Sequence, residues 1–75
     1  MDGDTATVVG SLADLYRTHR LALVRLAVLL LGDQPTAEDV VQEVFIGLHR
    51  AGRTDVSLAY LRVSVVNRSR SAIRR

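Results

Sequence analysis

The sequence predicts an all-α domain built from three helices, and three observations favour this class. The chain has 75 residues, which is enough for one small domain. Apolar residues recur at three- and four-residue steps in three separate segments. A single proline and only three aromatic residues fit an aliphatic helical core better than a β-sandwich. Helices are therefore expected at about residues 12–31, 37–51 and 58–74.

The first helix is expected to follow Ser11, an N-cap residue type with an acidic residue, Asp14, three positions later. Residues 1–10 show no clear period, so a flexible N-terminal tail is expected there. Gly32 is placed to end the helix as a C-terminal cap. Because its second half is apolar nearly all round, we expect this to be the central and most buried helix.

The other two helices are bounded by residue types that favour turns and caps. The segment Asp33–Pro35 is expected to form a turn, and Thr36 to cap the second helix. Gly52 is expected to end that helix. Either Asp55 or Ser57 can cap the third helix. The domain should thus span residues 11–75.

Several classes of function find no support in the composition. The chain has no cysteine, so neither a disulfide scaffold nor a thiolate zinc site is expected. His19 and His49 lie too far apart to suggest a metal motif. Asp39 and Glu43 have no nucleophile or base beside them, so the protein is not expected to be an enzyme or to need a cofactor. The longest uninterrupted apolar run is too short for a membrane helix and the N-terminus is acidic, which predicts a cytoplasmic protein with no membrane partner.

Charge is unevenly distributed along the chain. Residues 1–49 hold seven acidic residues and three arginines, whereas residues 50–75 hold seven arginines and a single acidic residue. This split indicates two partner surfaces of opposite charge. All ten basic residues are arginine, which suits phosphate contacts and stacking. A GC-rich genome would explain the absence of lysine equally well.

The outward face of the second helix mixes polar side chains with one apolar side chain. On a helical wheel, the residues opposite the core stripe include Asp39, Gln42, Glu43 and Ile46. An apolar residue surrounded by carboxylates resembles the anchor of an interface with a basic helical partner. A solvated face with one stray isoleucine is the alternative, and it is the commoner case.

The outward face of the third helix carries groups that suit nucleic acid. Arginines of this helix can neutralise phosphates, Tyr60 can stack on an unpaired base, and Asn67 can bind a base edge. The alternative is that arginines near a helix C-terminus stabilise the helix dipole and keep the domain soluble.

Three segments in order resemble region 2 of the extracytoplasmic-function (ECF) sigma factors. They are LYRTHRLALVRLA at residues 15–27, LGDQPTAEDVVQEVF at residues 31–45, and AYLRVSVVNRSRS at residues 59–71. Together they extend the resemblance over about residues 11–75. The resemblance implies a three-helix sigma region 2 domain. That family usually has a further domain, region 4, and nothing in these residues corresponds to it.

The resemblance also implies partners and the residues that meet them. Binding to the β′ clamp coiled coil of RNA polymerase core falls on Asp39, Gln42, Glu43 and Ile46. Recognition and melting of the promoter minus-ten element as single-stranded non-template DNA fall on Arg53, Thr54, Tyr60, Asn67, Arg70 and Arg74. An anti-sigma factor is a further expected partner. Two alternatives stay open: a truncated sigma-like module that binds polymerase or an anti-sigma protein without initiating, and a general helical DNA-binding domain.

Overall fold

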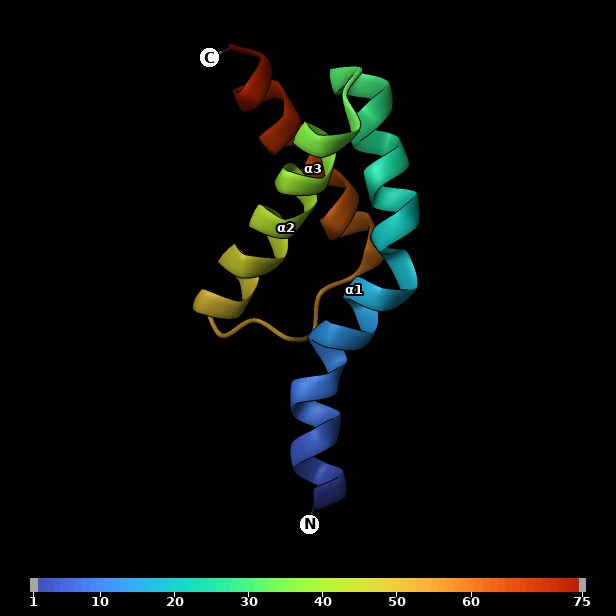
Figure 1. The fold of residues 1–75 in the computed structure, drawn as a ribbon. Coiled ribbons are helices and arrows are strands. Elements are labelled where there is room, and N and C mark those ends of the chain that lie inside the picture. The colour runs from blue at the N-terminus through green and yellow to red at the C-terminus, as the bar shows by residue number, and fades with distance from the viewer. Residues whose placement is uncertain (1, 75) are drawn as a thin grey trace.

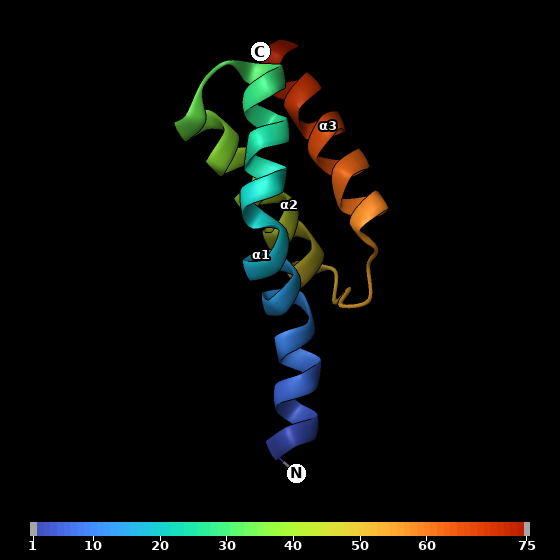
Figure 2. The same cartoon turned by 90° about the vertical axis from the view of Figure 1, so that its right-hand side faces the viewer.

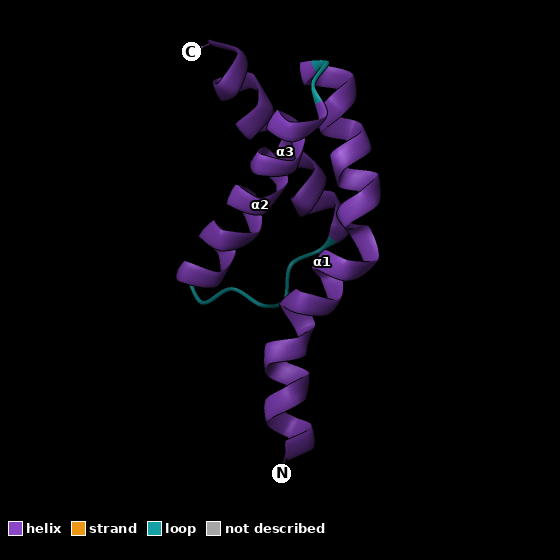
Figure 3. Ribbon diagram, viewed as in Figure 1, coloured by secondary structure: helices purple, strands orange, loops and turns teal. Residues whose placement is uncertain are grey.

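Three helices make up the structure, a computed structural model that describes the backbone of residues 2–74 and the side chains of residues 12–73. Helix α1 spans Asp2–Leu31, α2 spans Gln34–Arg50 and α3 spans Leu58–Arg74. Helix α2 runs back along α1, and α3 returns in the direction of α1, so that all three pack around one core (Figures 1 and 2). The described residues contain no strand (Figure 3). The predicted all-α class is confirmed.

Helix α1 begins ten residues earlier than the sequence predicted. It runs unbroken through Ser11, which therefore is not an N-cap. The first turns project beyond α2 and α3 (Figures 1 and 2), and the molecule measures 45 × 21 × 20 Å along its principal axes. The predicted start of α1 was based on the period of its apolar residues. That period reflects packing against other helices, and it is absent where α1 has no neighbour. Extending a formed helix adds one hydrogen bond per residue and needs no new nucleus, so the helix continues.

The connection between α1 and α2 is shorter than predicted. Gly32 has φ 74°, a left-handed conformation that suits a helix end at glycine. The side chain of Asp33 accepts a hydrogen bond from the backbone N–H of Thr36 at 2.8 Å. Asp33 is therefore the N-cap, and the prediction of Thr36 for this role is wrong. Pro35 lies in the first turn of α2, where its missing N–H costs nothing.

A seven-residue connection follows α2. Gly52 has φ 72°, and the N–H of Arg53 donates to the carbonyl of Leu48 at 2.9 Å. These features form a Schellman cap, which confirms the predicted stop at Gly52. Of the two residues predicted to cap α3, Ser57 does so, because its Oγ accepts from the N–H of Tyr60 at 3.0 Å. The residues after Gly52 continue as a loop up to α3 (Figure 3).

The core is aliphatic and draws on all three helices. Its most buried side chains are Leu23, Ala27, Ala37, Val41, Leu61 and Val65. The prediction that the first helix is the most buried one is wrong: its second half is apolar nearly all round, but Leu29 is 83% exposed, and more of the buried core residues belong to α2. Two neighbours cover only part of the surface of α1. Among the described residues, no helix is long and apolar enough to cross a membrane.

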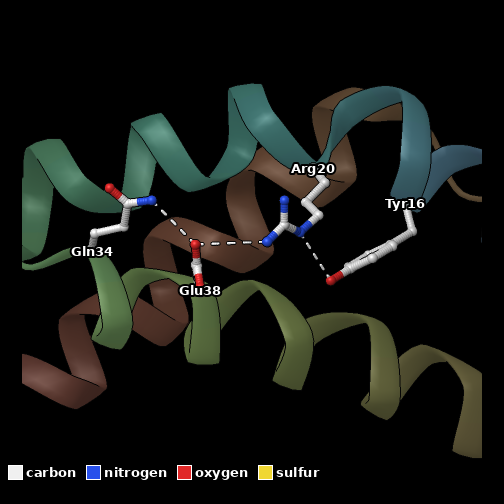
Figure 4. A network of polar contacts seen from close by, with 4 residues as sticks. All are labelled: Tyr16, Arg20, Gln34 and Glu38. Atoms are coloured by element: carbon white, nitrogen blue, oxygen red, sulfur yellow. Dashed lines mark hydrogen bonds and ion pairs between the residues drawn. The ribbon is translucent and has the colours of Figure 1, made fainter.

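A polar network ties α1 to α2 on one side of the core (Figure 4). The Nε of Arg20 donates to the Tyr16 hydroxyl at 3.2 Å, and its guanidinium lies 3.6 Å from a carboxylate oxygen of Glu38. The amide of Gln34 donates to the same Glu38 oxygen at 3.2 Å. The ring of Tyr16 meets that of Phe45 edge to face, with centroids 5.0 Å apart. This side of α2 is thus occupied by contacts within the domain.

Candidate functional site

The outward surface of α2, which we call the docking face, consists of Asp39, Gln42, Glu43 and Ile46. All four side chains are exposed, as the wheel predicted. Ile46 is 46% exposed although it is a large apolar residue. It borders a hollow of about 400 Å³ between α1 and α2, which Leu12 and Phe45 help to line. The docking face is therefore apolar beside this hollow, and its other side chains are two carboxylates and an amide.

The opposite edge of the docking face reaches α3. Glu43 accepts a hydrogen bond from the Nε of Arg68 at 2.9 Å, across 25 residues of sequence. The carboxylate of Asp39, one turn earlier, has no ion-pair partner among the described residues. The charge of Glu43 is therefore partly neutralised by Arg68, whereas that of Asp39 is not. The spacing of the two residues on the helix did not reveal this difference.

A groove of about 460 Å³ lies between α2 and α3 and reaches the connecting loop. Helix α2 contributes one wall, which includes Glu43 and Gly47. The other wall and the end hold Arg53 from the loop with Tyr60 and Asn67 from α3. Three of the residues predicted to contact DNA are thus gathered in one groove.

A cation–π contact stands at the loop end of the groove. The guanidinium carbon of Arg53 lies 4.9 Å from the centroid of the Tyr60 ring. Tyr60 remains 40% exposed, so part of its side chain is accessible to a partner. The site thus offers a stacking surface with a positive charge held beside it.

The remaining residues predicted to contact DNA lie outside this groove. Thr54 is half-buried in the loop and does not line the groove. Arg70 is exposed on the other flank of α3, beside a separate hollow shared with Leu26 of α1. Arg74 belongs to the last turn of α3, and its side chain lies outside the described residues. The predicted set therefore does not form a single cluster.

Several polar residues that α3 adds to the groove were given no role from the sequence alone. Ser64 and Arg68 line the groove beside Tyr60. They follow Tyr60 at four-residue steps, which places them on one stripe of the helix. That spacing could have predicted which residues of α3 line the groove. The pairing of Arg68 with Glu43 could not be predicted, because it depends on how α2 and α3 pack.

The groups in the groove suit the binding of a charged partner. The donors are guanidinium, amide and hydroxyl groups, and no described side chains form a group of three or more metal-ligating residues. Guanidinium groups bind phosphate, and an aromatic ring stacks on any base. The groove chemistry suits a single-stranded nucleic acid.

Comparison with known proteins identifies the family of this chain. The sequence profile of the family Sigma-70 region 2 matches residues 15–75, which include the second half of α1 and the whole of α2 and α3. Searches of curated proteins and of solved structures return no match. The family match covers well over half of the chain and agrees with the observed helices. The chain therefore belongs to the sigma-70 region 2 family: it is a sigma factor domain with a role in binding RNA polymerase and recognising promoters, and it is not an enzyme.

Proposed function

We propose that the docking face of α2 binds the β′ clamp coiled coil of RNA polymerase, and that the groove between α2 and α3 binds the non-template strand of the minus-ten element as single-stranded DNA. The observation that carries the proposal is the gathering of Arg53, Tyr60 and Asn67 in one groove. Arg53 belongs to the loop before α3, and Tyr60 and Asn67 belong to α3 itself. Their chemistry matches what an unpaired nucleotide needs: charge, a stacking surface and a hydrogen-bonding amide.

The composition of the docking face supports a helical, basic partner. Ile46 provides an exposed apolar anchor, and Asp39 and Gln42 stand beside it on the same surface. A coiled coil presents a ridge of side chains that can pack against one helix face. Carboxylates around the anchor would orient a cationic partner and speed its association.

The form of the groove supports single-stranded DNA over a duplex. In a duplex the bases are stacked on one another, and a Tyr60 ring can reach a base only after it has left the stack. Arg53 beside that ring can neutralise the adjacent phosphate. Binding of the unpaired strand at this site would favour strand separation at the promoter.

A stacking test addresses the DNA site. Tyr60→Ala should weaken binding of a labelled single-stranded oligonucleotide by about 5- to 150-fold, since a stacked base contributes roughly 1–3 kcal/mol. Val63→Ala is the matched control, because Val63 is also exposed on α3 and does not line the groove. Fluorescence anisotropy measures both. Equal affinities for the two variants would rule out stacking on Tyr60.

A second test addresses the docking face. Asp39→Arg and Ile46→Ala should each weaken binding to the isolated β′ clamp coiled coil, measured by calorimetry, with Leu29→Ala as an exposed apolar control on α1. If neither the wild type nor the control binds the clamp, the result would favour a general DNA-binding domain. Clamp binding without promoter opening would favour a regulatory module that does not initiate.

The finer classification is a proposal as well. The three segments that resemble ECF sigma factors support membership of that group, in which an anti-sigma protein is the expected second partner. Such a protein would compete with the clamp if it covered the docking face. A competition assay with the Ile46→Ala variant would show whether the two partners share this surface.

A further inference from the structure

The middle of the groove between α2 and α3 has small residues on both walls. The two helices run in opposite directions, and Glu43 of α2 contacts Arg68 of α3 at 2.9 Å (Figure 1). One turn from this pair towards the connecting loop, α2 carries Gly47 and α3 carries Ser64. Both residues line the groove. The groove is therefore hollow at this level because neither wall has a long side chain there.

Neither the backbone nor the packing of α2 requires a glycine at position 47. Among the described residues, the glycines with a positive φ are Gly32 and Gly52, so Gly47 has an ordinary helical conformation. Beyond its own helix backbone, a Cβ added at Gly47 would meet no heavy atom within 4 Å. Glycine is among the least favourable residues inside a helix. The folded domain would thus be more stable with alanine at this position.

The place of Gly47 in the groove accounts for a glycine there. A residue without a side chain lets a ligand approach the helix backbone closely. The groove has a volume of about 460 Å³, within the range of about 300–1,000 Å³ that is usual for small-ligand sites. Any side chain at position 47 would occupy part of this space. The position therefore trades helix stability for room in the groove.

We propose that Gly47 is a specificity-determining residue, whose missing side chain lets an unpaired nucleobase enter the groove and lie against the backbone of α2. The facing wall then offers the ring of Tyr60 for stacking and the half-buried hydroxyl of Ser64 for a hydrogen bond. The inference rests on the proposed DNA site and deepens it. It states that the size of residue 47 limits the size of the base that the groove admits.

The experiment enlarges this residue without weakening the helix. Gly47→Ala and Gly47→Leu both introduce good helix formers. Gly47→Leu should weaken binding of a labelled single-stranded oligonucleotide of about 12 nucleotides by at least about fivefold, because the base loses its stacking contact. Gly47→Ala should weaken binding less, yet raise the thermal midpoint by about 4–8 °C. Fluorescence anisotropy measures the affinity, and circular dichroism measures the midpoint.

The choice of oligonucleotide tests whether the room serves a base. Purines are larger than pyrimidines, so Gly47→Ala should weaken binding of oligo-dA more than binding of oligo-dT. An oligonucleotide of the same length with abasic sites throughout has only the backbone to offer. The wild type and Gly47→Leu should bind it with equal, low affinity.

A variant with an added side chain elsewhere is the matched control. Ala22 is exposed on α1 and lines none of the hollows described above. Ala22→Leu should therefore keep the DNA affinity of the wild type. A loss of affinity in this variant equal to that in Gly47→Leu would overturn the inference, because it would reflect a general effect of surface apolarity.

The other outcomes separate the inference from the proposed function. If both Gly47 variants bind DNA as tightly as the wild type while Tyr60→Ala binds more weakly, the role of Gly47 is overturned and the DNA site stands. An equal loss with the abasic oligonucleotide would also overturn it, since the added side chain would then obstruct the backbone. A lower midpoint for Gly47→Ala would contradict the free space at this position. If the wild type binds no single-stranded DNA, the inference and the proposed DNA site both fail.

Discussion

The hydroxyl group of Ser69 lies in an apolar setting that does not suit it. The residue is fully buried on the inner face of α3, and its Oγ has no hydrogen-bond partner among the described residues. A buried hydroxyl without a partner loses its bonds to water and gains none in exchange. The Ser69 hydroxyl therefore lowers the stability of the folded domain.

Replacing Ser69 by alanine should stabilise the domain. The expected gain in the free energy of unfolding is about 1–2 kcal/mol, because the change removes an unsatisfied group and raises helix propensity. Urea denaturation followed by circular dichroism measures it. Ser71→Ala is the matched control: Ser71 is exposed on the same helix, so it reports propensity alone. Equal gains in both variants would mean that the Ser69 hydroxyl is satisfied in solution.

Each helix end depends on a residue whose backbone or side chain suits that position. Gly32 and Gly52 end α1 and α2 in left-handed conformations, and Ser57 caps α3.

The N-cap of α2, Asp33, is a charged residue whose pKa depends on the cap. Hydrogen bonds from the side chain and backbone of Thr36 lower the pKa of Asp33 from the ordinary value of 3.8, because they favour the charged carboxylate.

The lowered pKa of Asp33 predicts how α2 responds to acid. A group whose pKa is lower in the folded state stabilises that state above the unfolded-state pKa, and this contribution is lost as pH falls through the folded-state value. Asp33→Asn keeps an N-cap residue type but cannot titrate. The wild type should therefore be the more stable of the two at neutral pH, and the difference in thermal midpoint should shrink below about pH 4. A difference that is independent of pH would contradict the charge-based account.

Sequence patterns predicted the three helices more accurately than they predicted where each helix begins. The stops at Gly32 and Gly52 were predicted because only glycine adopts that conformation freely. The start of α2 was misplaced because Asp33 and Thr36 are both N-cap types spaced three residues apart, and only the observed hydrogen bond decides between them. The wheel identified Ile46 and Tyr60 as outward residues. It could not identify the partner of Glu43, because that partner lies on another helix.

The whole molecule is a small bundle with a single aliphatic core, so its stability is concentrated in few side chains. A domain of this size buries only about 60% of the surface of its unfolded chain. Leu61 is fully buried at the centre, whereas Leu29 on α1 is 83% exposed. The two leucines therefore contribute very differently although their residue type is the same.

Leu61→Ala should destabilise the domain by about 2–5 kcal/mol, which is a large part of the total for a chain this short. Leu29→Ala should change the free energy of unfolding by less than about 0.5 kcal/mol. Thermal denaturation followed by circular dichroism compares the two. A comparable loss for Leu29→Ala would show that the outer face of α1 is covered in solution.

The position of Tyr60 also provides the domain with an intrinsic optical probe. The chain contains no tryptophan, so its ultraviolet emission comes from two tyrosines. Tyr16 lies against Phe45 and Arg20, away from the groove, whereas Tyr60 stands in the groove beside Arg53. In a Tyr16→Phe variant, all emission would come from the groove. Quenching of that emission by an incoming base would follow occupancy in real time, without a label on either partner.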